Sequence, residues 1–249
     1  MRLLSNCMIG VLISFFAAHD GLVAMNTCNQ ETPLMKAAAK GFYKEAETLL
    51  AIKDDVNAHD EDGWTALFYA ARYGHNDVAE LLLTNGALVN MQDKDGFTAL
   101  MRAILGGHVP MISLLLENGA NVELKSKNCY TALMFAISQK SLEMLRLLIA
   151  WHADVNAQGW LGITPLMCAA RQEFLPVVHL LVVKNKVNVD KQGWFGKTAL
   201  MYAAECGDVN VVLFLKKHGA DITIKDALKK TAFDYACKKG HRSVAALLC

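Results

Sequence analysis

The feature that most constrains this chain is a threonine that recurs about every 33 residues. Seven threonines share the register, with successive spacings of 33, 33, 33, 33, 34 and 33 residues: Thr32, Thr65, Thr98, Thr131, Thr164, Thr198 and Thr231. In every unit, leucine or phenylalanine follows the threonine after two residues, alanine after five and leucine after seventeen. A period of this length indicates stacked units, each too small to bury its apolar face alone. The chain is therefore predicted to be a solenoid.

The repeated columns predict two short helices in each unit. The threonine stands where its side-chain oxygen can cap the first helix. Pro33 and Pro165 follow it directly, at a first-turn position that needs no N–H donor. The alanine column is expected where two helices approach closely. Polar segments between the units contain Asp-Gly steps such as Asp62-Gly63, which predict hairpin-like turns.

These columns resemble the ankyrin repeat. The segment Thr32–Ala37 reads T-P-L-M-K-A and is similar to the family motif T-P-L-H-x-A, while Gly86–Asn90 is similar to the later family segment G-A-x-V-N. In five units methionine replaces the histidine of the first motif. The resemblance covers residues 26–249. It implies an all-α solenoid of seven helix-turn-helix repeats joined by hairpin-like loops.

Repeats four and five depart from the family pattern. Lys140 and His152 in repeat four, and Glu173 in repeat five, stand where the pattern has glycine. Repeat five also holds one extra residue near Lys184 to Lys186. We expect these two units to be the least regular. The seventh repeat ends at Leu248-Cys249 and is expected to be a terminal cap.

The first 25 residues stand apart from the repeats. Arg2 is the only charged residue before Asp20, and the apolar run Cys7–Ala18 lies between them. This run suits the hydrophobic region of a secretory signal peptide and is too short to span a bilayer. Residues 1–25 are therefore predicted to be a signal peptide, cleaved after Ala24, which would make the protein secreted or exported. The alternative is an apolar segment that covers the first repeat of a cytoplasmic protein.

Sequence motifs give no support for catalysis or for a cofactor. A formal net charge of +1 provides no global field for nucleic acid, so no nucleic-acid partner is predicted. Seven cysteines without a C-x-x-C pair are neither a disulfide framework nor a zinc site. Gly196-Lys197-Thr198 imitates the end of a phosphate-binding loop, but the first glycine of that motif would fall at Lys191.

A histidine that recurs in three repeats also gives no support for catalysis or for a cofactor. His75, His108 and His241 share one repeat position, and turn hydrogen bonds explain them better than a metal does. We predict no catalytic residue, no metal site and no cofactor, and therefore a protein that is not an enzyme.

Aromatic side chains on the loops indicate a binding surface instead. Trp64, Phe97 and Tyr130 directly precede the threonine in three successive units, and Trp160 and Trp194 recur in near-identical loops. In ankyrin-like arrays these loops and the exposed end of the first helix face the concave binding side. Aromatic and arginine side chains on an open surface are typical of binding hot spots. The predicted partner-binding residues are Trp64, Arg72, Tyr73, Phe97, Tyr130, Gln139, Trp160, Arg171, Gln172, Trp194 and Phe195. The alternative is that each ring packs on its own neighbouring loop.

The sequence thus predicts a monomeric scaffold that binds a partner protein through its loops and concave helical face. An alternative is a substrate-targeting or regulatory subunit of a separate enzyme complex. Neither prediction includes a stable membrane span.

Overall fold

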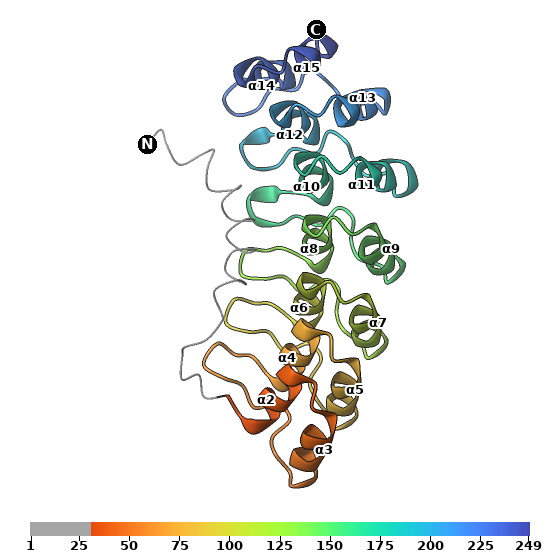
Figure 1. The fold of residues 1–249 in the computed structure, drawn as a ribbon. Helices are drawn as coiled ribbons and strands as arrows, with labels where there is room; N and C mark the ends of the chain where they lie inside the picture. The colour runs from red at the N-terminus through yellow and green to blue at the C-terminus, as the bar shows by residue number, and fades with distance from the viewer. Residues whose placement is uncertain (1–30) are drawn as a thin grey trace.

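The computed structural model describes residues 31–249, which form an elongated stack of helix pairs (Figure 1). The first helices of the pairs are α2 (Pro33–Lys40), α4 (Ala66–Tyr73), α6 (Ala99–Gly106), α8 (Ala132–Ser138), α10 (Pro165–Arg171), α12 (Ala199–Cys206) and α14 (Ala232–Lys239). The second helices are α3 (Tyr43–Ala51), α5 (Asn76–Thr84), α7 (Val109–Glu117), α9 (Leu142–Ala150), α11 (Leu175–His179), α13 (Val209–Lys217) and α15 (Arg242–Leu247). This part of the chain contains no strand, so the all-α prediction is confirmed.

The helices form two parallel rows. Each first helix packs against the first helices before and after it, and the second helices form the other row. Six loops join successive pairs and project from the stack on the side away from the second helices (Figure 1). We call these segments the hairpin loops. No helix in residues 31–249 is long and apolar enough to cross a membrane.

The threonine column begins the first helices as expected. All seven threonines are N-cap residues with extended backbone angles. Five side chains accept a hydrogen bond from the backbone N–H three residues later: Thr32, Thr98, Thr164, Thr198 and Thr231. Thr65 and Thr131 make no such bond. The capping prediction therefore holds for five repeats, and the helix start is kept in all of them.

The alanine and leucine columns form the core. Every alanine five residues after the threonine is at most 1% exposed, and the leucine column is fully buried from Leu82 to Leu215. At the two ends, Leu49 is half-buried and Leu248 is 5% exposed, because each terminal repeat has a neighbour on one side only. The methionines that replace the family histidine are also buried, from Met35 to Met201.

Repeats four and five keep the backbone conformation of the other repeats, although some of their residues are strained in it. Lys140, His152 and Glu173 take the left-handed conformation, with φ of 52°, 63° and 56°, at the positions where other repeats have glycine. Side chains other than glycine pay about 1–2 kcal/mol for this conformation. The extra residue of repeat five lies in a π-helical turn, η2 (Leu180–Lys184), which widens the second helix by one residue. The predicted irregularity is thus confirmed and is largest in repeat five.

The recurrent histidines connect neighbouring repeats. The Nε2 atoms of His75, His108 and His241 lie 3.1, 3.1 and 3.2 Å from carbonyl oxygens of the preceding repeat, at Ala39, Arg72 and Glu205. A carbonyl only accepts, so Nε2 carries the proton and donates. The histidines do form hydrogen bonds, but not within their own turns as predicted: each bond reaches the end of the preceding first helix.

The predicted signal peptide or N-terminal apolar segment, residues 1–25, lies outside the described residues.

Candidate partner-binding surface

The tips of the hairpin loops form a continuous row. The backbone N–H of Lys94 donates to the carbonyl of Asp62 in the preceding loop, at 2.9 Å, and Lys127 donates to Asp95 at 2.8 Å. The same bond recurs from Trp160 to Asn128 and from Ala227 to Phe195. These bonds fix four of the five pairs of neighbouring tips, and among the described residues no such bond joins the Trp160 tip to the Trp194 tip.

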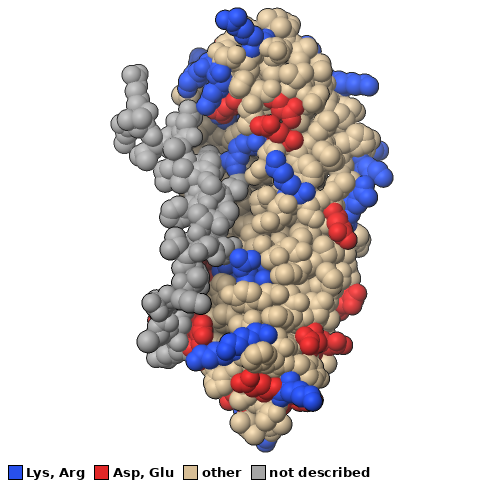
Figure 2. Space-filling model, in the orientation of Figure 1, with Lys and Arg blue, Asp and Glu red and all other residues tan. Residues whose placement is uncertain are grey.

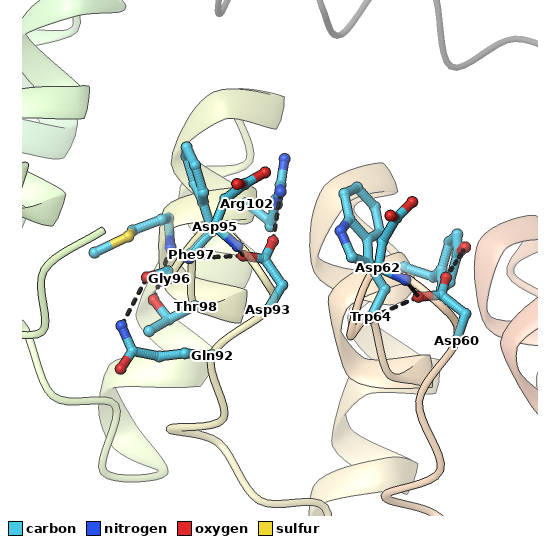
Figure 3. A network of polar contacts seen from close by, with 12 residues as sticks. Asp60, Asp62, Trp64, Gln92, Asp93, Asp95, Gly96, Phe97, Thr98 and Arg102 are labelled. Atoms are coloured by element: carbon cyan, nitrogen blue, oxygen red, sulfur yellow. Dashed lines mark hydrogen bonds and ion pairs between the residues drawn. The ribbon is translucent and has the colours of Figure 1, made fainter. Parts of the chain in front are cut away.

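A buried aspartate organises three of the six loops. Oδ1 of Asp60 accepts hydrogen bonds from the backbone N–H groups of Asp62 and Trp64, both at 2.9 Å (Figure 3). Its Oδ2 accepts a bond from the hydroxyl of Tyr69, nine residues later on α4, at 2.8 Å. Asp60 is only 3% exposed. The loop is therefore folded by one carboxylate, and the first helix supplies a donor to its second oxygen.

The next loop repeats this arrangement with an ion pair. Asp93 Oδ1 accepts from the backbone N–H groups of Asp95 and Phe97, and its Oδ2 lies 2.5 Å from a guanidinium nitrogen of Arg102 (Figure 3). The Arg102 guanidinium also lies between two rings, 4.2 Å from Trp64 and 4.3 Å from Phe97. An arginine stacked on aromatic faces gains cation–π attraction in addition to its ion pair. Arg102 therefore links the hairpin loops of two successive repeats.

A pairing of this kind is present where the loop position equivalent to Asp60 and Asp93 holds aspartate. Asp226 pairs with the hydroxyl of Tyr235, again nine residues later. In the other three loops the aspartate is replaced by Ser126, Gly159 and Gly193. This aspartate, with tyrosine or arginine nine residues later, is a signal that our sequence analysis did not use.

The two tryptophan loops, which hold glycine at this position, turn differently from the others. Their tips are short 3-10 segments, η1 (Trp160–Gly162) and η3 (Trp194–Gly196). Leu161 and Phe195 adopt the left-handed conformation, with φ of 61° and 58°. Strain of this kind at exposed loop tips is often associated with function. The two tryptophan loops thus have large apolar side chains at the outer edge of the array.

Three of the predicted contact residues are exposed on these tips. Trp160 is 41% exposed, Trp194 is 55% and Phe195 is 50%. The rings of Trp194 and Phe195 lie against each other, with centroids 4.3 Å apart. Leu228, at the next tip, is 64% exposed and was missed by the sequence analysis.

The first aromatic row behaves differently from our expectation. Phe97 is 3% exposed, so the prediction that it presents an open ring is wrong. It packs on Arg102 and on Phe135, whose ring centroid lies 5.1 Å away. Trp64 and Tyr130 are half-buried: Trp64 packs on Tyr69 and Arg102, and Tyr130 packs on Phe135. These rings also pack on side chains of the first helices α4, α6 and α8, so the alternative of rings packed on neighbouring loops does not describe this row fully either.

The remaining predicted residues lie at the ends of the first helices. Tyr73 at the end of α4 is 53% exposed, and Gln139 just after α8 is exposed. Arg72, Arg171 and Gln172 are partly exposed. We call these five residues the first-helix ends.

The fold accounts for Cys168, Lys197 and Thr198, which could otherwise suggest chemistry. Burial raises the pKa of the Cys168 thiol to about 11, so little reactive thiolate forms near neutral pH. Lys197 pairs with Glu205 at 2.7 Å, and Thr198 caps α12. Within residues 31–249, no group of three histidine, cysteine or acidic side chains could hold a metal ion.

Comparisons with known proteins agree with this architecture. A family model described as ankyrin repeats, in three copies, matches residues 6–93, 81–159 and 166–249, and its first match begins inside the apolar N-terminal segment. The crystal structure of the human ASB11 ankyrin repeat domain is similar, with a TM-score of 0.78 and 29% identity, covering 88% of this chain and 98% of that chain. No curated protein matched the sequence. The chain belongs to the ankyrin repeat family.

Proposed function

We propose that this protein is a non-catalytic scaffold that binds one partner protein through the first-helix ends and the adjoining sides of the hairpin loops. Ankyrin repeats generally mediate protein–protein interactions and are typically not catalytic. The finer proposal concerns which surface of this array makes the contact.

The observation that carries the proposal is that the ends of the first helices vary in sequence while the core positions stay constant. The alanine and leucine columns repeat in every unit, whereas the last two residues of the first-helix segment change completely from one unit to the next. They are Ala39-Lys40, Arg72-Tyr73, Leu105-Gly106, Ser138-Gln139, Arg171-Gln172, Glu205-Cys206 and Lys238-Lys239. Apart from Leu105, which packs against the core, these residues are not part of the hydrophobic core, so their chemistry is available for recognition. Tyrosine and arginine are enriched among binding hot spots.

The test begins with capture of a partner by the full chain, followed by titration of that partner against single variants. Arg171→Ala and Tyr73→Ala are each expected to weaken binding by about 1–2 kcal/mol. Arg146→Ala is the matched control, since Arg146 is exposed on α9 in the second-helix row. If Arg146→Ala weakens binding as much as Arg171→Ala does, the first-helix ends are not the contact surface.

The same surface would suit a substrate-targeting or regulatory subunit of an enzyme complex. Co-purification of a measurable enzymatic activity, rather than of a lone target protein, would favour this role.

We further propose that the protein is exported, on the basis of the apolar run Cys7–Ala18. Intact-mass measurement on protein from its native cell tests this proposal. A mature protein beginning near Met25 supports export, and retention of Met1 on soluble protein contradicts it.

A further inference from the structure

The hairpin tips fall into two chemical classes along the array. The tip is formed by the two residues before the last left-handed residue of each loop. In the first three loops these pairs are charged or polar: Glu61-Asp62, Lys94-Asp95 and Lys127-Asn128. In the last three loops they are apolar: Trp160-Leu161, Trp194-Phe195 and Ala227-Leu228. We call these last six residues the apolar tip row.

The apolar tip row is exposed, and its last two tips are bonded to each other. Its four largest exposed side chains leave between 41% and 64% of their surface in solvent: Trp160, Trp194, Phe195 and Leu228. The backbone bond from Ala227 to Phe195, at 2.7 Å, fixes the last two tips against each other. Contiguous apolar surface of this kind marks an interaction site.

Basic side chains border this row. Lys191, Lys225 and Lys229 are exposed and lie one to three residues from a tip, and none forms an ion pair with another described residue. Residues 184–249 contain twelve Lys and Arg against six Asp and Glu, whereas residues 31–183 contain twelve against seventeen. Lys and Arg side chains are frequent at the C-terminal end of the array, at the top of Figure 2. The near-neutral whole chain therefore conceals a basic C-terminal third.

We propose that the apolar tip row docks on the surface of an anionic lipid membrane. Tryptophan prefers the membrane–water interface because its ring is amphipathic. Exposed apolar side chains can enter the headgroup region without spanning the bilayer, and nearby lysines gain attraction from anionic headgroups.

The composition of the row favours lipid over a protein partner. Lysine is depleted at protein interfaces, where arginine is enriched, yet the residues that border this row are lysines. Binding hot spots also lie in the centre of a packed patch, whereas these rings lie at the outermost edge of the loops. The docking surface is distinct from the first-helix ends, so this proposal does not depend on the proposed protein partner.

The experiment uses the fluorescence of the two tip tryptophans in the full chain. Trp64→Phe and Trp151→Phe leave Trp160 and Trp194 as the only tryptophans, and phenylalanine at position 64 keeps a ring against Arg102. The probes are vesicles of phosphatidylcholine alone, and of phosphatidylcholine with phosphatidylserine, each with brominated acyl chains. With phosphatidylserine present, we expect the emission to shift to shorter wavelength and to be quenched, and both effects to fade as salt increases.

Binding variants identify the residues responsible. Trp194→Ala with Phe195→Ala is expected to lower vesicle affinity at least tenfold, and Lys225→Gln and Lys229→Gln about fivefold each. Lys217→Gln on α13, an exposed lysine in the second-helix row, is the control and should have no effect. Circular dichroism checks that each variant is folded.

Two results would overturn the proposal. If the protein sediments with vesicles while its tip tryptophans remain unquenched, another part of the chain makes the membrane contact. If no vesicle changes the emission and Trp194→Ala with Phe195→Ala abolishes binding of the captured partner, the row is a protein interface.

Discussion

A single residue in each hairpin loop decides how that loop is built. Where the position holds aspartate, the carboxylate binds two backbone N–H groups and a donor from the first helix, as Asp93 does with Arg102. Where it holds glycine, at Gly159 and Gly193, the loop turns through a left-handed apolar residue instead. Phe97 and Phe195 occupy different positions in their loops: Phe97 directly precedes the threonine and is buried, whereas Phe195 lies at a loop tip and is exposed.

The ion pair between Asp93 and Arg102 should be a main determinant of stability. Both side chains are buried, so Asp93→Ala leaves an arginine without its carboxylate partner and two N–H groups without an acceptor. We expect a loss of about 3 kcal/mol in the free energy of unfolding. Urea denaturation measures this loss. Asp95→Ala, an exposed change in the same loop, is the control, and an equal effect there would refute the role of the pair.

Buried tyrosine should make the fold sensitive to alkali. Burial raises the pKa of Tyr202 to about 12, above the ordinary value near 10. The folded state thus resists ionisation that the unfolded state accepts, so stability is complete below pH 10 and decreases as the pH rises towards 12. Tyr202→Phe should reduce this decrease by about 1–2 kcal/mol.

Unfolding followed by circular dichroism across this pH range checks the tyrosine prediction. Tyr73→Phe, on an exposed ring, is the control. A pH dependence that is unchanged in Tyr202→Phe would show that this hydroxyl is not responsible.

At the scale of the element, the backbone conformation that ends the first helix is kept even where the residue type changes. The position that ends the first helix is left-handed in every repeat, whether it holds glycine, as at Gly107, or a long side chain, as at Lys140 and Glu173. This backbone conformation is therefore kept even where the residue is unfavourable for it. The π-helical turn in repeat five is another example, because the stack absorbs an inserted residue within one helix.

Two glycines separate conformational strain from steric contact. A Cβ atom at Gly74 would lie 2.6 Å from Nδ1 of His108, whereas one at Gly107 would meet nothing within 4 Å. Gly107→Ala should therefore cost only the left-handed penalty of about 1–2 kcal/mol. Gly74→Ala should cost more, because it also displaces the imidazole that bonds to the carbonyl of Arg72. Equal losses in thermal denaturation would show that the contact is unimportant.

At the scale of the whole molecule, stability comes from interfaces between neighbours. Each helix packs within its own unit and against adjacent units, so the core extends along the whole stack. An internal repeat has two such interfaces and a terminal repeat has one. The functional surfaces extend along the same axis, which brings the three apolar tips of successive repeats together.

The position of a defect along the stack should therefore set its cost. Leu148 is completely buried in the central repeat, and Leu148→Ala should open a cavity that costs about 2–5 kcal/mol. Ala136→Leu, at a fully buried helix contact in the same repeat, should cost about 1–3 kcal/mol through overpacking. Leu248→Ala in the last repeat is the comparison and should cost less. Equal losses at Leu148 and Leu248 would argue against stability set by two neighbours.

The sequence by itself determined the repeat register, the all-α class and the helix starts. Each of these depends on local features that recur seven times, such as the threonine cap and the buried alanine. Repetition averages out single departures, so Lys140 and Glu173 did not obscure the pattern. The first-helix ends and the tryptophan loops were also placed correctly on the surface.

Only the tertiary structure decided which rings are buried. Phe97 and Phe195 are both loop aromatics in the sequence, but their exposure depends on contacts with residues of other elements. Phe97 packs on Arg102 of α6 and on Phe135 of the next repeat, while the ring of Phe195 lies against Trp194 at a loop tip and is 50% exposed. A local pattern cannot report such contacts, because they form only when the repeats stack and the Asp93 carboxylate orients Arg102 between two rings.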